Sequence, residues 1–98
     1  MTTLDTNAIK DLIIPIARKY GIERVFIFGS VARGEANANS DYDFLITKGN
    51  LQNLIQYASF ISELENTLKC HVDVITDTSS DAELINVAMQ EAILLYER

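Results

Sequence analysis

The feature that most constrains this fold is an amphipathic stretch of about nineteen residues with a short β-rich run on each side. The stretch spans residues 51–69, and its apolar side chains recur every three or four positions, the period of one helix face: Leu51, Leu54, Ile55, Ala58, Ile61, Leu64 and Leu68. The runs YDFLIT (42–47) and HVDVIT (71–76) are typical of strands. A helix of this length allows a right-handed crossover, so we expect parallel strands here.

A second pair of strands should be antiparallel. Residues 6–20 have helical spacing that Gly21 ends, and Pro15 should kink this helix or break its start. RVFIF (24–28) is a predicted strand, and only about a dozen residues separate it from the run at 42–47. That distance is too short for a full crossover helix but suits an antiparallel neighbour.

The chain should end in a helix. Ser80 and Glu83 form a capping box in front of Ile85, Ala88, Met89, Ala92, Ile93 and Tyr96, so the helix is expected to run close to the C-terminus. The predicted order is helix, strand, turn, strand, helix, strand, helix. We therefore expect an α/β fold, more closely an α+β mixed sheet flanked by helices, as a single domain over residues 1–98.

Composition narrows the functional class. The chain has fourteen acidic and eight basic side chains, a net charge of -6, whereas affinity for duplex nucleic acid comes mostly from Lys and Arg. The N-terminus lacks the pattern of a secretion signal, and no apolar stretch is long enough to span a membrane. A single cysteine, Cys70, excludes an internal disulfide. These features predict a cytoplasmic protein that does not bind duplex nucleic acid or membranes.

Three aspartates are expected to converge at one end of the sheet. Alternation along strand 42–47 puts Asp41 and Asp43 on the face opposite the apolar side chains, and Asp73 is placed in the same way on the next strand. Carboxylates this close repel one another, and Mg²⁺ would relieve the repulsion because it prefers oxygen ligands. The alternative is that Asp41 and Asp43 cap the loop and are simply solvated.

The turn after strand 24–28 suits a polyphosphate. Gly29 allows phosphate groups to approach the backbone, and the amides and the Ser30 hydroxyl can donate hydrogen bonds to phosphate oxygens. If the two strands are antiparallel, Gly29 and Ser30 lie beside Asp41 and Asp43. This end of the sheet would then hold a triphosphate and the metal ions that activate it.

The string GSVARGEANANSDYD, followed by the aspartate of HVDVI, resembles the nucleotidyltransferase superfamily that includes DNA polymerase beta, and most of all its minimal prokaryotic branch. The resemblance covers nearly the whole chain. It implies that Asp41 and Asp43 bind two Mg²⁺ ions. Asp73 would be the third metal ligand and the acceptor of the proton from an attacking hydroxyl. Gly29 and Ser30 would hold the β- and γ-phosphates of ATP.

The resemblance also implies a partner. Minimal nucleotidyltransferases are often encoded beside a helical HEPN-domain toxin, to which they attach AMP as antitoxins, so a HEPN toxin is the expected acceptor. A module that neutralises its partner only by binding is the alternative. Nucleotidylation of a small molecule ranks lower, because the chain offers no second lobe for such an acceptor.

Several neighbouring residues allow two interpretations. Arg33 is a candidate nucleotide contact or a surface partner of Glu35. Ser40 is a candidate in the nucleotide site, although bonding to the loop backbone is the better explanation. His71 shares the acid face and could join the metal site, but we interpret it as a polar residue at the strand edge.

Overall fold

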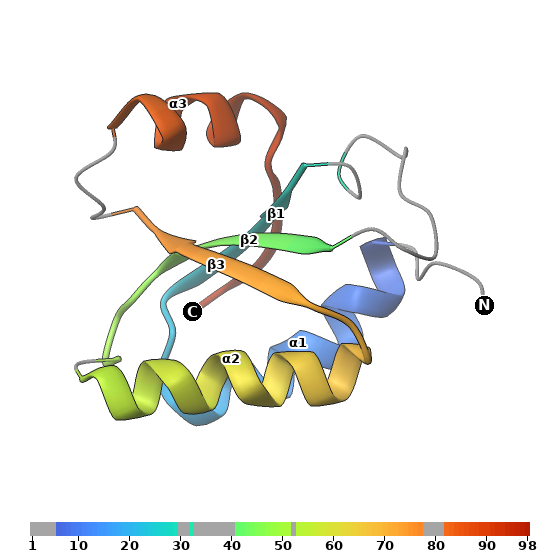
Figure 1. Ribbon diagram of the computed structural model, residues 1–98, viewed down its shortest axis with the longest axis vertical. Coiled ribbons are helices and arrows are strands. Elements are labelled where there is room, and N and C mark those ends of the chain that lie inside the picture. The colour runs from blue at the N-terminus through green and yellow to red at the C-terminus, as the bar shows by residue number, and fades with distance from the viewer. Residues whose placement is uncertain (1–5, 30–31, 33–40, 52, 78–81) are drawn as a thin grey trace.

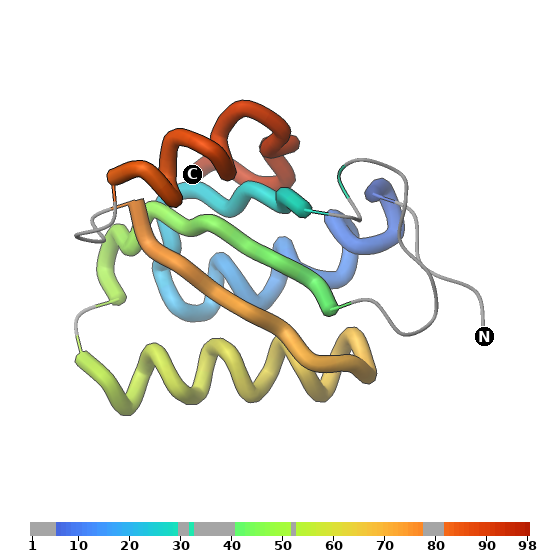
Figure 2. The backbone as a smooth tube through the Cα atoms, turned by 45° about the horizontal axis from the view of Figure 1, so that its top comes forward, coloured from blue at the N-terminus to red at the C-terminus, as the bar shows by residue number. Residues whose placement is uncertain are grey.

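Four strands form one mixed sheet between two helical layers (Figure 1). The computed structural model describes residues 6–29, 32, 41–51, 53–77 and 82–98. Its elements are α1 (Thr6–Tyr20), β1 (Arg24–Phe28), β2 (Tyr42–Thr47), α2 (Leu54–Leu68), β3 (Val72–Thr76), α3 (Ala82–Glu91) and β4 (Ile93–Glu97). The strand order is β3-β2-β1-β4. Helices α1 and α2 lie on one face of the sheet and α3 lies on the other (Figures 1 and 2).

The predicted strand pairing is confirmed on both sides of β2. β1 pairs with β2 antiparallel, with Phe28 opposite Asp43, and β2 pairs with β3 parallel, with Asp43 opposite Asp73. The helix α2 is the crossover between the two parallel strands. These two registers carry the end of β1 and the starts of β2 and β3 to the same end of the sheet.

The prediction of a helix up to the C-terminus is wrong. α3 ends at Glu91, and Ile93–Glu97 form β4, which pairs antiparallel with β1 through a register shift between Val25 and Phe26. The spacing of Ile93 and Tyr96 fits one helix face, but the run ILLY is equally apolar and has strong strand formers. The vacant edge of β1 decides the outcome, because a strand there satisfies backbone groups and buries Leu95 to 1% exposure.

Hydrogen bonds between residues close in the sequence fix where α1 ends and where α2 begins. Gly21 has φ +68°, and the amides of Gly21 and Ile22 donate to the carbonyls of Arg18 and Ala17, which is a Schellman motif. α1 runs without a break across exposed Pro15, so the predicted broken start is not found. α2 begins at Leu54, later than predicted, because the Asn53 side chain accepts the Gln56 amide at 2.8 Å.

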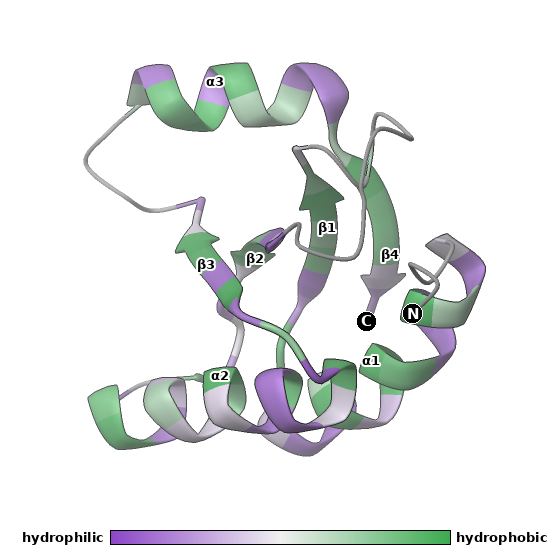
Figure 3. Ribbon diagram, turned by 45° about the vertical axis from the view of Figure 1, so that its right-hand side comes forward, coloured by the Kyte–Doolittle hydropathy of each residue, from purple (hydrophilic) through white to green (hydrophobic). Residues whose placement is uncertain are grey.

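The main core lies between the sheet and the α1–α2 layer. It contains Ile9, Ile13 and Ile16 of α1, Phe60, Leu64 and Leu68 of α2, and Tyr42, Phe44 and Ile46 of β2. Polar and apolar residues alternate around α2 and α3 (Figure 3). On the opposite face, Leu45 of β2 and Ala88 of α3 are each 1% exposed. The acid-bearing face of β2 is therefore the α3 face.

Among the described residues, no helix combines the length and the apolar character that a membrane span requires.

Candidate active site

The turn that follows β1 brings the backbone against Asp43. Gly29 has φ +76°, a conformation that L side chains rarely adopt, and a Cβ added there would overlap the carboxylate of Asp43. Because Phe28 pairs with Asp43, the turn begins directly beside this side chain. Glycine at position 29 thus allows the carboxylate to lie against the main chain.

Glu91, at the end of α3, is tied to the same turn. Its Oε1 atom accepts a hydrogen bond of 3.1 Å from the Gly29 amide. The Gly29 amide is one of the donors that we predict from the sequence to bind phosphate. Sequence reasoning missed Glu91, since no pattern in a C-terminal helical stretch indicates contact with a turn sixty-two positions earlier.

A second group of side chains gathers where β2 and β3 begin. The Tyr42 amide donates to the carbonyl of His71 at 3.2 Å, so the residues before the two strands lie side by side. Asp41, His71 and Asp73 each present a ligand atom, and these atoms lie within 4.8 Å of one another. The His71 Nδ1 atom is 3.5 Å from Asp41 Oδ2 and 3.7 Å from Asp73 Oδ1. Asp73 therefore points to the same side as Asp41, as alternation predicts.

This group is open to solvent. The side chains of Asp41, His71 and Asp73 are 55%, 59% and 56% exposed, so water solvates their charges and a dissolved ion can reach them. Two carboxylates with an adjacent imidazole make a donor set that a divalent cation can use. The residues present therefore fit a divalent metal.

The predicted site residues fall into two sets. Gly29, Asp41, Asp43 and Asp73 lie at one end of the sheet, with the Asp43 carboxylate against the turn and the Asp41 and Asp73 carboxylates beside His71. Ser30, Arg33 and Ser40 lie outside the described residues.

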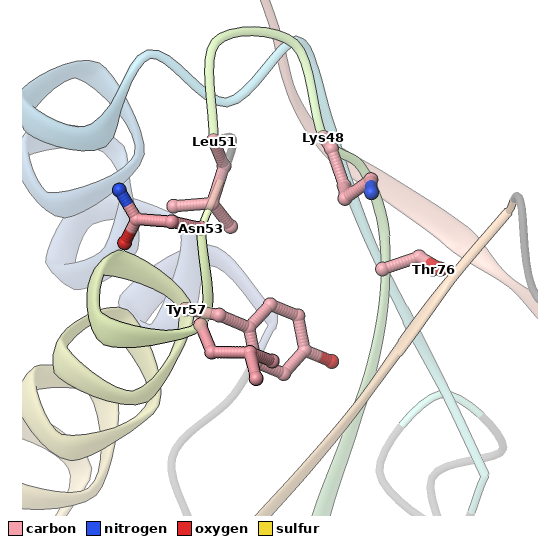
Figure 4. A pocket seen from close by; sticks show the side chains of 6 residues that line it. Lys48, Leu51, Asn53, Tyr57 and Thr76 are labelled. Atoms are coloured by element: carbon pink, nitrogen blue, oxygen red, sulfur yellow. The ribbon is translucent and has the colours of Figure 1, made fainter.

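A pocket of about 290 Å³ lies at the other end of β2 and β3 (Figure 4). Its lining residues are Lys48, Leu51, Asn53, Leu54, Tyr57 and Thr76. The Tyr57 hydroxyl donates to the Val74 carbonyl at 2.9 Å. Because β2 starts at Tyr42 and Lys48 follows its last residue, roughly 20 Å of strand separates this pocket from the carboxylates. The pocket is thus separate from the acid group.

Comparison with known proteins identifies a family and relatives that are similar in sequence to this chain. Residues 11–98 match the family described as polymerase beta, nucleotidyltransferase. A relative from Methanocaldococcus jannaschii, provisionally named a protein adenylyltransferase, is 39% identical over 90 residues, which cover 92% of this chain and 97% of the relative. The chain therefore shares both its length and its sequence pattern with that relative.

Solved structures share the fold. One, described provisionally as a minimal nucleotidyltransferase, superposes with a TM-score of 0.79 at 30% identity and covers 95% of this chain and 98% of its own. A toxin-antitoxin structure with AMP-PNP has a TM-score of 0.79 at 21% identity, covering 91% and 73%. A tri-AMPylated HEPN toxin from Shewanella oneidensis in complex with MNT antitoxin has a TM-score of 0.73 at 17% identity, covering 95% and 73%.

The motif, the strand registers and the family match over residues 11–98 agree, and this chain belongs to the polymerase beta nucleotidyltransferase family.

Proposed function

We propose that this nucleotidyltransferase transfers AMP from ATP to a hydroxyl side chain of a partner HEPN toxin, in the cytoplasm, and so acts as an antitoxin. The observation that carries the proposal is the meeting of the Gly29 turn with Asp41, Asp43 and Asp73 at one end of the sheet. The protein adenylyltransferase name of the M. jannaschii relative supports the reaction class, and the AMPylated toxin complex supports the acceptor.

In the proposed reaction, the acceptor hydroxyl attacks the α-phosphorus of ATP. A new bond forms between the hydroxyl oxygen and the α-phosphorus, the bond to the bridging oxygen breaks, and pyrophosphate leaves. Asp73 is assigned the proton of the hydroxyl because the family resemblance implies this role for the third acid, and its exposed carboxylate at the start of β3 is accessible to an acceptor. Asp41, Asp43 and Asp73 would hold Mg²⁺, which neutralises charge on the phosphates and makes the hydroxyl more acidic.

The turn residues would bind the triphosphate. Gly29 offers its amide, and Ser30 is assigned the same phosphates, with Arg33 and Ser40 as further nucleotide contacts. In the structure the Gly29 amide donates to Glu91. A phosphate oxygen would therefore take over or share a donor that a carboxylate already uses, and repulsion between the two anions favours replacement.

The test is to incubate the chain with ATP, Mg²⁺ and the product of the neighbouring gene, which the proposal identifies as the HEPN protein, and to weigh that product by mass spectrometry. A mass gain of whole AMP units is expected, and it should disappear in Asp41→Asn and Asp43→Asn. Asp77→Asn is the matched control, because Asp77 follows β3 at its other end and accepts from the Thr47 hydroxyl at 2.8 Å. No mass gain with the wild-type chain would refute transfer. Full neutralisation of the toxin by both variants without any mass gain would instead favour an antitoxin that acts by binding.

A further inference from the structure

His71 lies on the acid-bearing face, but neither the family match nor the aspartate pattern assigns it a role. It immediately precedes β3 and lies opposite Asp41, since Tyr42 pairs with Val72 in the parallel register. Its Nδ1 atom faces two carboxylate oxygens at 3.5 and 3.7 Å, both longer than an ordinary N–H···O hydrogen bond. The imidazole is thus turned toward both aspartates without a short bond to either one.

These separations are short enough for side chains that could share an ion. Two atoms bound about 2.1 Å from one octahedral cation lie roughly 3 Å apart when adjacent and about 4.2 Å apart when opposite. The two distances from His71 lie between these two values, so a small rotation of the side chains would bring the donor atoms to the adjacent separation. A cation between the three side chains could contact all three without any large movement of the strands, whose registers place them together.

The nitrogen ligand has a chemical consequence. Carboxylates and water suit Mg²⁺, whereas an imidazole favours first-row transition metals, whose affinity for nitrogen sites rises from Mn²⁺ through Co²⁺ to Ni²⁺. A site with Asp41 and Asp73 alone would gain little from replacing Mg²⁺. Adding His71 makes the same site more selective for a transition metal.

We propose that His71 is a nitrogen ligand of the cation bound by Asp41 and Asp73, and that it shifts the preference of this site from Mg²⁺ toward transition metals such as Co²⁺. The inference rests on the proposed function, because it concerns the cation site that the proposed reaction uses. It does not require that AMP transfer occur.

The test uses the full chain and Co²⁺ alone. His71 is the only histidine, so a paramagnetically shifted imidazole resonance in the proton NMR spectrum of the Co²⁺-bound protein reports on this residue alone. We expect that resonance in the wild type. We also expect His71→Asn to weaken Co²⁺ binding about tenfold or more, while the Mg²⁺ affinity from competition titration changes by less than about threefold. Circular dichroism of the variant checks that it is folded.

The outcomes separate this inference from the proposed function. Equal losses of Co²⁺ and Mg²⁺ affinity in His71→Asn, or Co²⁺ binding without a shifted imidazole resonance, overturn the role of His71 and leave the carboxylate site standing. Unchanged binding of both ions in Asp41→Asn would instead overturn the cation site itself, and His71 with it.

Discussion

Replacing Gly29 with alanine should damage the active site more than the fold. At φ +76° an L residue costs about 1–2 kcal/mol, and the new Cβ would overlap the Asp43 carboxylate. The contact can be relieved if Asp43 leaves its rotamer, at about 0.5–1.5 kcal/mol. The sum is roughly 1.5–3.5 kcal/mol, which for a chain of this size lowers Tm by about 6–28 °C. The displaced Asp43 should abolish most AMP transfer.

Gly21→Ala provides the matched control. Gly21 has φ +68°, and a Cβ there would lie 2.9 Å from the Asn50 Cβ, so it carries a similar left-handed cost and a tight contact. It precedes β1, whereas Gly29 follows it, so the length of the strand separates Gly21 from the carboxylates.

The assay compares thermal unfolding with the rate of AMP transfer to the HEPN protein, measured well below both Tm values. We expect both variants to lose stability and only Gly29→Ala to lose transfer. Transfer at the wild-type rate in folded Gly29→Ala, or an equal loss in Gly21→Ala, would refute the reasoning that the turn positions Asp43.

Three further predictions concern other parts of the chain. Leu95→Ala should lower the free energy of unfolding in urea by about 2–5 kcal/mol, whereas Leu94→Ala, at a position 46% exposed, should cost far less; equal effects would contradict the burial of β4. The hydrogen bond from Lys19, at 2.5 Å, lowers the pKa of the Glu63 carboxyl below its usual 4.5. Its contribution is therefore present above pH 4.5 and is lost as the pH falls through the folded pKa. The urea midpoint of Glu63→Gln should lie slightly below that of the wild type at pH 7 and meet it in acid, and a constant difference would contradict this sign. Burial raises the pKa of the Cys70 thiol, so its reaction with a disulfide reagent at pH 8 should be slower than that of a cysteine peptide, and a faster reaction would disprove this.

The sequence by itself determined the sheet around β2. Short β-branched runs separated by a long amphipathic helix admit a parallel crossover, and a short connection favours an antiparallel neighbour. Alternation then places Asp41, Asp43 and Asp73 on one face, and the structure has these registers. These predictions follow from local rules of periodicity and connection length, which can be applied to a single sequence.

Only the tertiary structure decided whether residues 93–97 form a helix or a strand, and which residues Glu91 and His71 contact. The run ILLY fits either a helix face or a strand, and the free edge of β1, formed by distant residues, selects the strand. The Gly29–Glu91 hydrogen bond and the position of His71 beside both Asp41 and Asp73 join segments that are far apart in the sequence or lie on separate strands. Such contacts follow from the packing of whole elements, because side-chain partners depend on register and layer order as well as on local propensity.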